Sequence, residues 1–309
     1  MKKTIIKKAF TLLEVVMVIV ILGIVSSIAS TIIADVYDNY LIQRATYKAS
    51  LKTELAAQQI ANMLSYRIKG TTLARRPANL NDYVLVTDGT NLSDNTHTVL
   101  EWIGYDHDSF EAANPPGWDG FCDINASLAG GNIVTPGSNL DLAQTIMRNI
   151  TRNDVPNTDR PAIFFNDYLY RFTPDVEYNV ACMGLIDNNT TCISTVDFTA
   201  DSEQLNFNLN AGLANKLIIE HYKLAASAYA LWPAPNPRTG NFDLRLYYNY
   251  QPWAGERLAS NNTYSTLISN VTVFKFAEAA DTFRFKLCAQ ESIGTDYNIT
   301  ICKEKAIIL

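Results

Sequence analysis

The chain has 309 residues, which is enough for one large domain or two small ones, and its net charge is −6. All four charges in residues 1–9 are lysines, so without that segment 21 basic side chains face 31 acidic ones, a net charge of −10. This acidic balance argues against a basic nucleic-acid-binding surface, and we expect no nucleic-acid partner.

Residues 7–34 combine a basic start with a long apolar stretch. Lys7 and Lys8 come first, and the residues from Val15 to Ala34 are all uncharged, a run long enough to cross roughly 30 Å of hydrocarbon. Glu14 lies at the start of this stretch, where a carboxylate costs about 2–4 kcal/mol and needs a partner. The simplest partner is a free α-amino group at Phe10, which requires cleavage between Ala9 and Phe10.

An ordinary cleaved signal peptide is the alternative interpretation of this segment. Its apolar region would be unusually long, and no small-residue cleavage site followed by a soluble start comes before the next expected helix. Cleavage before the apolar run therefore explains the sequence better than cleavage after it.

The run Ala9-Phe10-Thr11-Leu12-Leu13-Glu14 resembles the class III leader of type IV pilins and type II secretion pseudopilins. The family usually has Gly at the position of Ala9. The resemblance implies cleavage after Ala9 by prepilin peptidase and N-methylation of Phe10. It also implies that Glu14 pairs with the Phe10 amine of a neighbouring subunit during filament assembly, because an unpaired charge is costly at low dielectric.

The same resemblance divides the chain into three parts. Residues 1–9 are the leader peptide, residues 10–69 a long helix with a transmembrane segment at about 12–34, and residues 70–309 a β-rich periplasmic domain. The basic leader keeps the N-terminus cytoplasmic by the positive-inside rule. We therefore expect a single-pass inner-membrane protein that later enters a pilus or pseudopilus.

Neither Gly nor Pro occurs between Gly23 and Gly70, so one helix is expected to run from about Thr11 to Lys69. Its second half is amphipathic, and one apolar side is expected to dock on the globular domain. The apolar positions are Leu41, Leu51, Leu55, Ile60, Met63, Leu64 and Ile68; the polar positions between them include Lys48, Lys52, Glu54, Gln58, Gln59 and Arg67.

After residue 70, short β-rich runs alternate with Asn, Asp, Gly and Pro. The expected strands are Tyr83–Thr87, Val99–Ile103, Ala162–Asn166, Tyr168–Phe172, Asn179–Met183, Gln204–Leu209, Lys216–Tyr222, Ala225–Ala230, Phe242–Tyr248, Asn270–Ala277, Thr282–Cys288 and Tyr297–Lys303. Asp141–Asn149 is expected to be a short helix. The predicted fold class is α+β, with the long N-terminal helix packed on an antiparallel sheet.

Five cysteines are compatible with an oxidising compartment. Cys182 and Cys192 flank one turn, and Cys288 and Cys302 flank another. Period-2 alternation places Cys288 and Cys302 together on the polar face of a hairpin, which supports their pairing. Buried free thiols are the alternative, and Cys122 is left over.

No catalytic motif is present, so we expect a non-enzymatic protein without an obligate cofactor. Asp106, Asp108, Asp119 and Asp123 are candidate calcium ligands, because calcium prefers oxygen donors. Solvated acidic loops are the alternative interpretation of these residues.

The two runs Asp243–Tyr248 and Ser265–Phe276 are similar to the late strands of large minor pseudopilins of the J type and minor pilins of the W type. This implies a minor subunit that initiates or caps the filament, with other pilins, prepilin peptidase and the inner-membrane assembly platform as partners. A minor pilin for adhesion or DNA uptake is one alternative. A membrane-anchored periplasmic enzyme or binding protein is the other.

Overall fold

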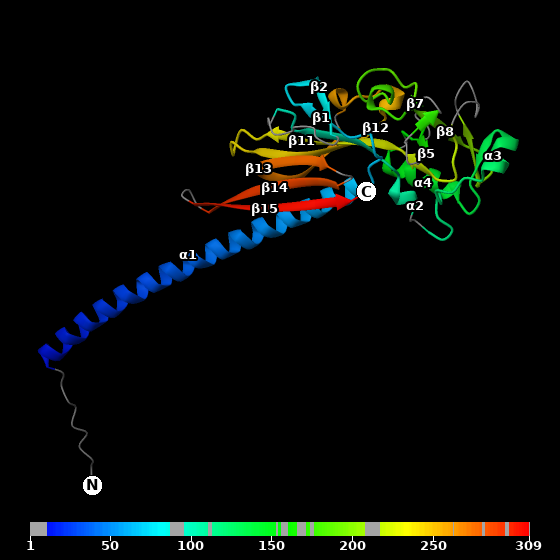
Figure 1. The fold of residues 1–309 in the computed structure, drawn as a ribbon. Coiled ribbons are helices and arrows are strands. Elements are labelled where there is room, and N and C mark those ends of the chain that lie inside the picture. Colours follow the sequence, from blue (N-terminus) through cyan, green and yellow to red (C-terminus); the bar gives the residue numbers. More distant parts are fainter. Residues whose placement is uncertain are drawn as a thin grey trace, which may run out of the picture.

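The computed structural model describes residues 11–86, 96–110, 113–152, 154–155, 160–165, 171–173, 176–207, 217–261, 263–279, 282–293 and 297–308. A long helix, α1 (Leu12–Ser65), carries the globular part on its C-terminal half, while its N-terminal half projects away from that part (Figure 1). The expected class, a long N-terminal helix followed by antiparallel β-structure, is confirmed.

Helix α1 is 54 residues long, which corresponds to about 81 Å. It ends at Ser65, four residues earlier than the sequence predicts, because the following residues pair with strand β3 (Val99–Gly104). Ile68 N donates to Ile103 O at 2.8 Å, and Tyr105 N donates to Tyr66 O at 2.9 Å. The bridge between Arg67 and Gly104 lies within this pairing, so pairing with β3 replaces the helical hydrogen bonds before Gly70 is reached.

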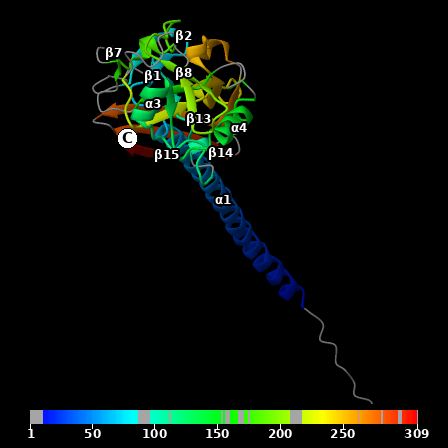
Figure 2. The same ribbon diagram turned by 90° about the vertical axis from the view of Figure 1, so that its right-hand side faces the viewer.

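The largest sheet has eight antiparallel strands within the described residues. Their order across the sheet is β15 (Tyr297–Ile308), β14 (Thr282–Ile293), β13 (Tyr264–Ala279), β12 (Phe242–Tyr250), β11 (Ser227–Pro235), β3, β1 (Leu73–Arg76) and β2 (Asn79–Leu85). The C-terminal half of α1 lies against β13, β14 and β15 (Figure 2). Elements at the two ends of the described chain are therefore neighbours in space.

A smaller layer lies beyond the C-terminal end of α1 (Figure 1). Its five-stranded sheet has the order β10 (Tyr222–Ala225), β5 (Ala162–Phe165), β8 (Ser194–Phe198), β9 (Gln204–Phe207) and β4 (Asn132–Val134). The remaining elements are the β6 (Arg171–Thr173) and β7 (Val176–Glu177) hairpin, helices α2 (His107–Phe110), α3 (Ile124–Gly130) and α4 (Leu140–Ile150), and 3₁₀ turns η2 (Val180–Cys182), η3 (Pro252–Ala254) and η4 (Leu258–Ser260).

Three apolar clusters form the core. The first fills the space between α1 and the large sheet, with Ile60 and Leu64 facing Phe283 and Leu287. The second includes Ile103, Phe164 and Tyr250 and lies between the large sheet and the smaller layer. The third surrounds Trp118 and joins α4 to the five-stranded sheet. This stacking positions the C-terminal ends of α1 and α4 close to each other.

The docking face of α1 differs from the prediction. Ile60 and Leu64 are buried as expected, but Leu51 and Leu55 are exposed and face away from the sheet. The buried positions are Ala45, Ala49, Thr53, Ala56, Ala57, Ile60 and Leu64. Small side chains allow the helix backbone to approach the sheet closely, which explains why alanines rather than leucines occupy most of this face.

Most of the expected strands are present with shifted bounds, but two predictions are wrong. Asn179–Met183 contains η2 instead of a strand, because the Asn179 side chain accepts a hydrogen bond from Ala181 N at 2.9 Å and caps a 3₁₀ turn. Within Lys216–Tyr222, the described residues before Tyr222 form no strand, and β10 begins at Tyr222. Strands β1, β4, β7 and β8 are not among the expected strands. The expected strand Tyr168–Phe172 lies partly outside the described residues.

Candidate functional site

The start of α1 is set by Thr11 and Glu14. Thr11 is the N-cap, and its Oγ1 accepts a hydrogen bond from Glu14 N at 3.3 Å. Thr-x-x-Glu is the capping-box pattern. The negative charge of an acidic side chain in the first turn also interacts favourably with the helix dipole. The sequence predicts an assembly role for Glu14; the capping role of Thr11 is an additional finding that the Thr-x-x-Glu spacing could have indicated.

The first half of α1 has no packing partner among the described residues. Every residue from Thr11 to Tyr40 is exposed, including all apolar side chains between Val15 and Ala34. By length and composition, α1 can cross a membrane, and none of its most apolar window is buried in the protein. Such a surface requires lipid or other apolar helices around it.

The docked half of α1 is held by ion pairs on both sides of its buried face. Glu291 of β14 pairs with Lys48 and, at 3.3 Å, with Lys52. On the opposite side, Glu54 lies 2.6 Å from Lys305 Nζ and 3.2 Å from Lys303 Nζ of β15. These pairs flank the alanine-rich face and fix the rotation of the helix on the sheet.

A second apolar stripe runs along the docked half of α1 and faces solvent. It consists of Tyr40, Tyr47, Leu51 and Leu55, and we call it the outer stripe. These residues are 55%, 71%, 46% and 62% exposed, respectively. At 100° per residue, they lie on the side of the helix opposite the docking face. The outer stripe continues the exposed first half of α1. Together they form an apolar surface along most of the helix that no other described residue covers.

Two disulfides join the cysteine pairs considered from the sequence. Cys182 bonds to Cys192, and Cys288 bonds to Cys302. Cys288 and Cys302 are direct cross-strand partners in β14 and β15. Cys302 is exposed, but Cys288 is buried at 2% exposure, so the pair is not entirely on a polar surface. Cys122 carries a free buried thiol, and burial raises its pKa.

The four acidic candidates for calcium do not gather in one place. Asp119 Oδ1 accepts hydrogen bonds from Thr135 Oγ1 at 2.7 Å and from Phe121 N at 2.9 Å, and so organises a loop. Asp123 caps α3, accepting from Ala126 N at 3.0 Å. Asp106 and Asp108 lie apart from them at α2. No group of three or more His, Cys, Asp or Glu residues within the described part of the chain could hold a metal ion.

Comparison with known families identifies the N-terminal segment. A family model described as the prokaryotic N-terminal methylation motif matches residues 6–30. This match covers the junction of Ala9 and Phe10, Glu14, and the first turns of the projecting helix. The segment is a class III prepilin leader of the pilin and pseudopilin type.

A prepilin leader implies processing by prepilin peptidase and assembly with other pilins. Assembly with other pilins accounts for the exposed apolar half of α1. The leader together with the exposed apolar helix fits membrane anchoring with an extramembrane globular domain. Ala9 and Phe10 themselves lie outside the described residues. No curated protein and no solved structure matches the chain.

Proposed function

We propose that this protein is a minor pseudopilin or minor pilin that initiates or caps the filament of a type II secretion system or a type IV pilus. Prepilin peptidase cleaves it after Ala9, and Phe10 becomes the methylated N-terminus. The globular domain lies in the periplasm, and the subunit has a structural rather than a catalytic role. The methylation-motif match, with Glu14 opening an exposed apolar half-helix, is the observation that carries this proposal.

Glu14 gives the proposal its physical mechanism. Its position in the first turn of α1 places a carboxylate at the edge of an apolar surface that no other described residue covers. In hydrocarbon an isolated carboxylate is costly, and pairing it with the Phe10 amine of a neighbouring subunit removes that cost. Pairing therefore sets the axial register between adjacent helices in the filament.

The outer stripe supports the same role. Filament subunits must pack helix against helix, and the docked half of α1 keeps an apolar face free for this after its other face has bound the sheet. Tyr47 and Leu55 on this face would be buried against a neighbouring subunit. The large globular domain favours a minor subunit, and so does the sequence resemblance of Asp243–Tyr248 and Ser265–Phe276 to late strands of J-type and W-type subunits.

The test is co-expression of the full chain with prepilin peptidase, followed by intact mass measurement and N-terminal sequencing. We expect a mature chain that begins at N-methylated Phe10. Incorporation into filaments is then compared for the parent chain and Glu14→Gln, which keeps the side-chain shape and removes the charge. We expect Glu14→Gln to be cleaved and to be poorly incorporated, because the scissile bond precedes Phe10 and the pairing charge is lost.

Asp38→Asn is the matched control, because it removes one exposed carboxylate from the same helix. It is expected to assemble like the parent. Retention of residues 1–9, or cleavage after Ala34, would refute the assembly role. Equal incorporation of the Glu14→Gln and parent chains would refute the pairing mechanism.

A further inference from the structure

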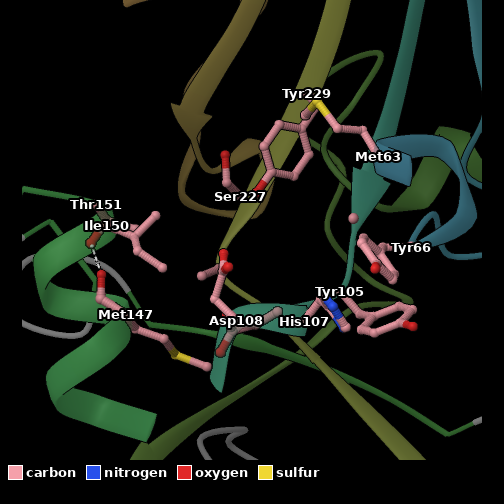
Figure 3. A pocket seen from close by; sticks show the side chains of 13 residues that line it. Met63, Tyr66, Tyr105, His107, Asp108, Met147, Ile150, Thr151, Ser227 and Tyr229 are labelled. Atoms are coloured by element: carbon pink, nitrogen blue, oxygen red, sulfur yellow. Dashed lines mark hydrogen bonds between the residues drawn. The ribbon is translucent and has the colours of Figure 1, made fainter. Parts of the chain in front are cut away.

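A small pocket lies where the ends of several elements meet (Figure 3). Its walls come from the last turn of α1, the end of β3 with α2, the C-terminal turn of α4 and the start of β11. Its volume is about 210 Å³, which is smaller than the roughly 300–1,000 Å³ of pockets that hold drug-sized ligands. An occupant must therefore be small or the tip of a longer molecule.

Asp106 is the unusual residue of this pocket. It is 8% exposed, and its Oδ2 atom has no hydrogen-bond partner among the residues that the structure describes. Oδ1 accepts a long hydrogen bond of 3.4 Å from Ser109 N. Burial raises the pKa of Asp106 to about 6, and nearby donors of Ser109 and Trp118 offset only part of that rise. Buried polar atoms are normally paired, so a carboxylate with one unpaired oxygen is an exception among the residues that line this pocket.

The surroundings of Asp106 favour a cation. Asp108 also lines the pocket, and among the described lining residues none is Lys or Arg. The C-terminal turns of α1 and α4 both line this region. A helix C-terminus carries partial negative charge, which Arg67 already meets in the last turn of α1 by donating to Leu64 O, so the contribution to the pocket comes from α4. Burial, and then the charges of Asp106 and Asp108, raise the pKa of Tyr229, whose phenol therefore stays neutral.

The walls favour an organic cation rather than a metal ion. Met63, Met147 and Ile150 supply apolar surface, and Tyr66, Tyr105 and Tyr229 supply aromatic surface (Figure 3). The ring of His107 is stacked on Tyr66 with centroids 3.8 Å apart. Hard metal ions require a shell of oxygen donors, whereas ammonium groups are bound by a carboxylate together with aromatic faces.

The protein already uses this aromatic chemistry next to the pocket. Lys223 Nζ lies 4.8 Å from the centroid of the Tyr105 ring. Lys223 lines the adjacent groove with Trp118 and Tyr222, outside the pocket that contains Asp106. Tyr105 lines both cavities, so the same ring that carries the Lys223 ammonium group in the groove also lines the pocket of Asp106.

We propose that this pocket binds a primary ammonium group on a short alkyl stem, with Asp106 as the charged anchor and the tyrosine and methionine side chains around the stem. The group is either a free alkylamine or the side chain of a lysine on a partner protein. The inference does not depend on a filament role, since it rests on the geometry of the globular part.

The test uses the full chain in detergent micelles and n-butylammonium chloride as the probe, with binding followed by calorimetry or ligand-observed NMR. Butan-1-ol is the neutral control ligand. We expect saturable one-to-one binding of butylammonium, no comparable binding of butanol, and at least ten-fold weaker binding to Asp106→Asn. Asp141→Asn, which removes a carboxylate at the other end of α4, should bind like the parent.

A second pair of variants guards against misfolding of Asp106→Asn. Ile150 is 44% exposed and lines the pocket, so Ile150→Lys supplies a tethered ammonium group at its rim. This variant should lose butylammonium binding, while Ile150→Met should keep it. Any of three results would overturn the proposal. The first is that butylammonium does not bind, and the second is that it binds equally well to the parent, Asp106→Asn and Ile150→Lys. The third is that calcium displaces butylammonium and butan-1-ol binds as tightly as butylammonium.

A last comparison separates the two sources of the ammonium group. Nα-acetyl-lysine methylamide carries the lysine side chain with a blocked backbone. Binding at least as tight as that of butylammonium would assign the pocket to a lysine of a partner protein. Binding of butylammonium with exclusion of the lysine derivative would assign it to a free amine.

Discussion

Arg67, two residues beyond the end of α1, donates a hydrogen bond from Nη2 to the Glu278 carboxylate of β13 at 3.2 Å. The Arg67 side chain is completely buried and that of Glu278 is 12% exposed. Arg67 Nη1 also donates to Leu64 O at 3.0 Å, and its guanidinium lies 4.9 Å from the centroid of the Phe283 ring. One side chain thus ties the last turn of α1 to the sheet, although the sequence placed it on the polar side of the helix.

Replacing Arg67 by Met should lower the free energy of unfolding by about 3 kcal/mol, because removal of one member of a buried pair leaves the other charge unpaired. Chemical denaturation of the full chain in micelles measures this. The double variant Arg67→Met/Glu278→Met should be less destabilised than the sum of the single variants. Strict additivity would mean that the pair does not couple α1 to β13.

Ala57→Leu should also destabilise the protein, by about 1–3 kcal/mol, because Ala57 is 0% exposed on the docking face and added volume must displace well-packed neighbours. Gln59→Leu is the control, since Gln59 is exposed on the same helix; its change should stay within about 0.5 kcal/mol. Equal effects of the two variants in denaturant unfolding would show that α1 is not closely packed on the sheet.

The outer stripe should matter for assembly and not for folding. Leu51→Ser/Leu55→Ser changes two side chains that are exposed on the side of α1 away from the sheet, so the unfolding midpoint should remain close to that of the parent. Filament incorporation, measured by immunoblotting of sheared filaments, should fall. A large loss of stability without loss of incorporation would contradict the assignment of this face to neighbouring subunits.

The stability of the protein should depend on the titration of Asp106. Its folded-state pKa of about 6 lies above the value of 3.8 usual for Asp, a difference worth roughly 3 kcal/mol. Because the folded pKa is raised, protonation favours the folded state: the contribution is fully present below about pH 4 and is lost as the pH rises through 6.

Asp106→Asn removes this titration, so the variant should be more stable than the parent at pH 7, and the difference should disappear towards pH 4. The groups around Asp106 that also carry titratable protons are Tyr66, Tyr105, His107, Asp108 and Tyr229. Comparing parent and variant at each pH cancels their contributions to first order. A parent chain that is more stable than Asp106→Asn at pH 7 would show that the carboxylate has a favourable partner.

The sequence predicts the ends of the structure best, for physical reasons. The Phe10–Glu14 motif combines residue type and spacing within a few residues, so no tertiary information is needed to recognise it. In β14 and β15, strict alternation of Phe283, Phe285 and Leu287 with polar residues marks a strand with one buried face. The adjacency of Cys288 and Cys302 follows from the same alternation.

The interior relationships depend on contacts distant in sequence. The docking face of α1 is mainly alanine, which is only weakly hydrophobic compared with leucine. The prediction from the sequence therefore assigned Leu51 and Leu55 to the docking face, which is wrong. Strand β1 was missed because it contains Arg75, whose charge is buried against Glu101. The Asp106 pocket takes its walls from four regions of the chain, and no local spacing reveals that arrangement.

The packing of α1 on β15 also imposes an order in time. The ribosome adds β15 about 230 residues after the end of α1, which takes roughly 12–50 s at 5–20 residues per second. During this interval the alanine-rich face of the helix has no surface to receive it, while its apolar half is already available to the membrane. Anchoring in the membrane can therefore precede folding of the globular domain. The second half of α1 can dock only after β14 and β15 have joined the sheet.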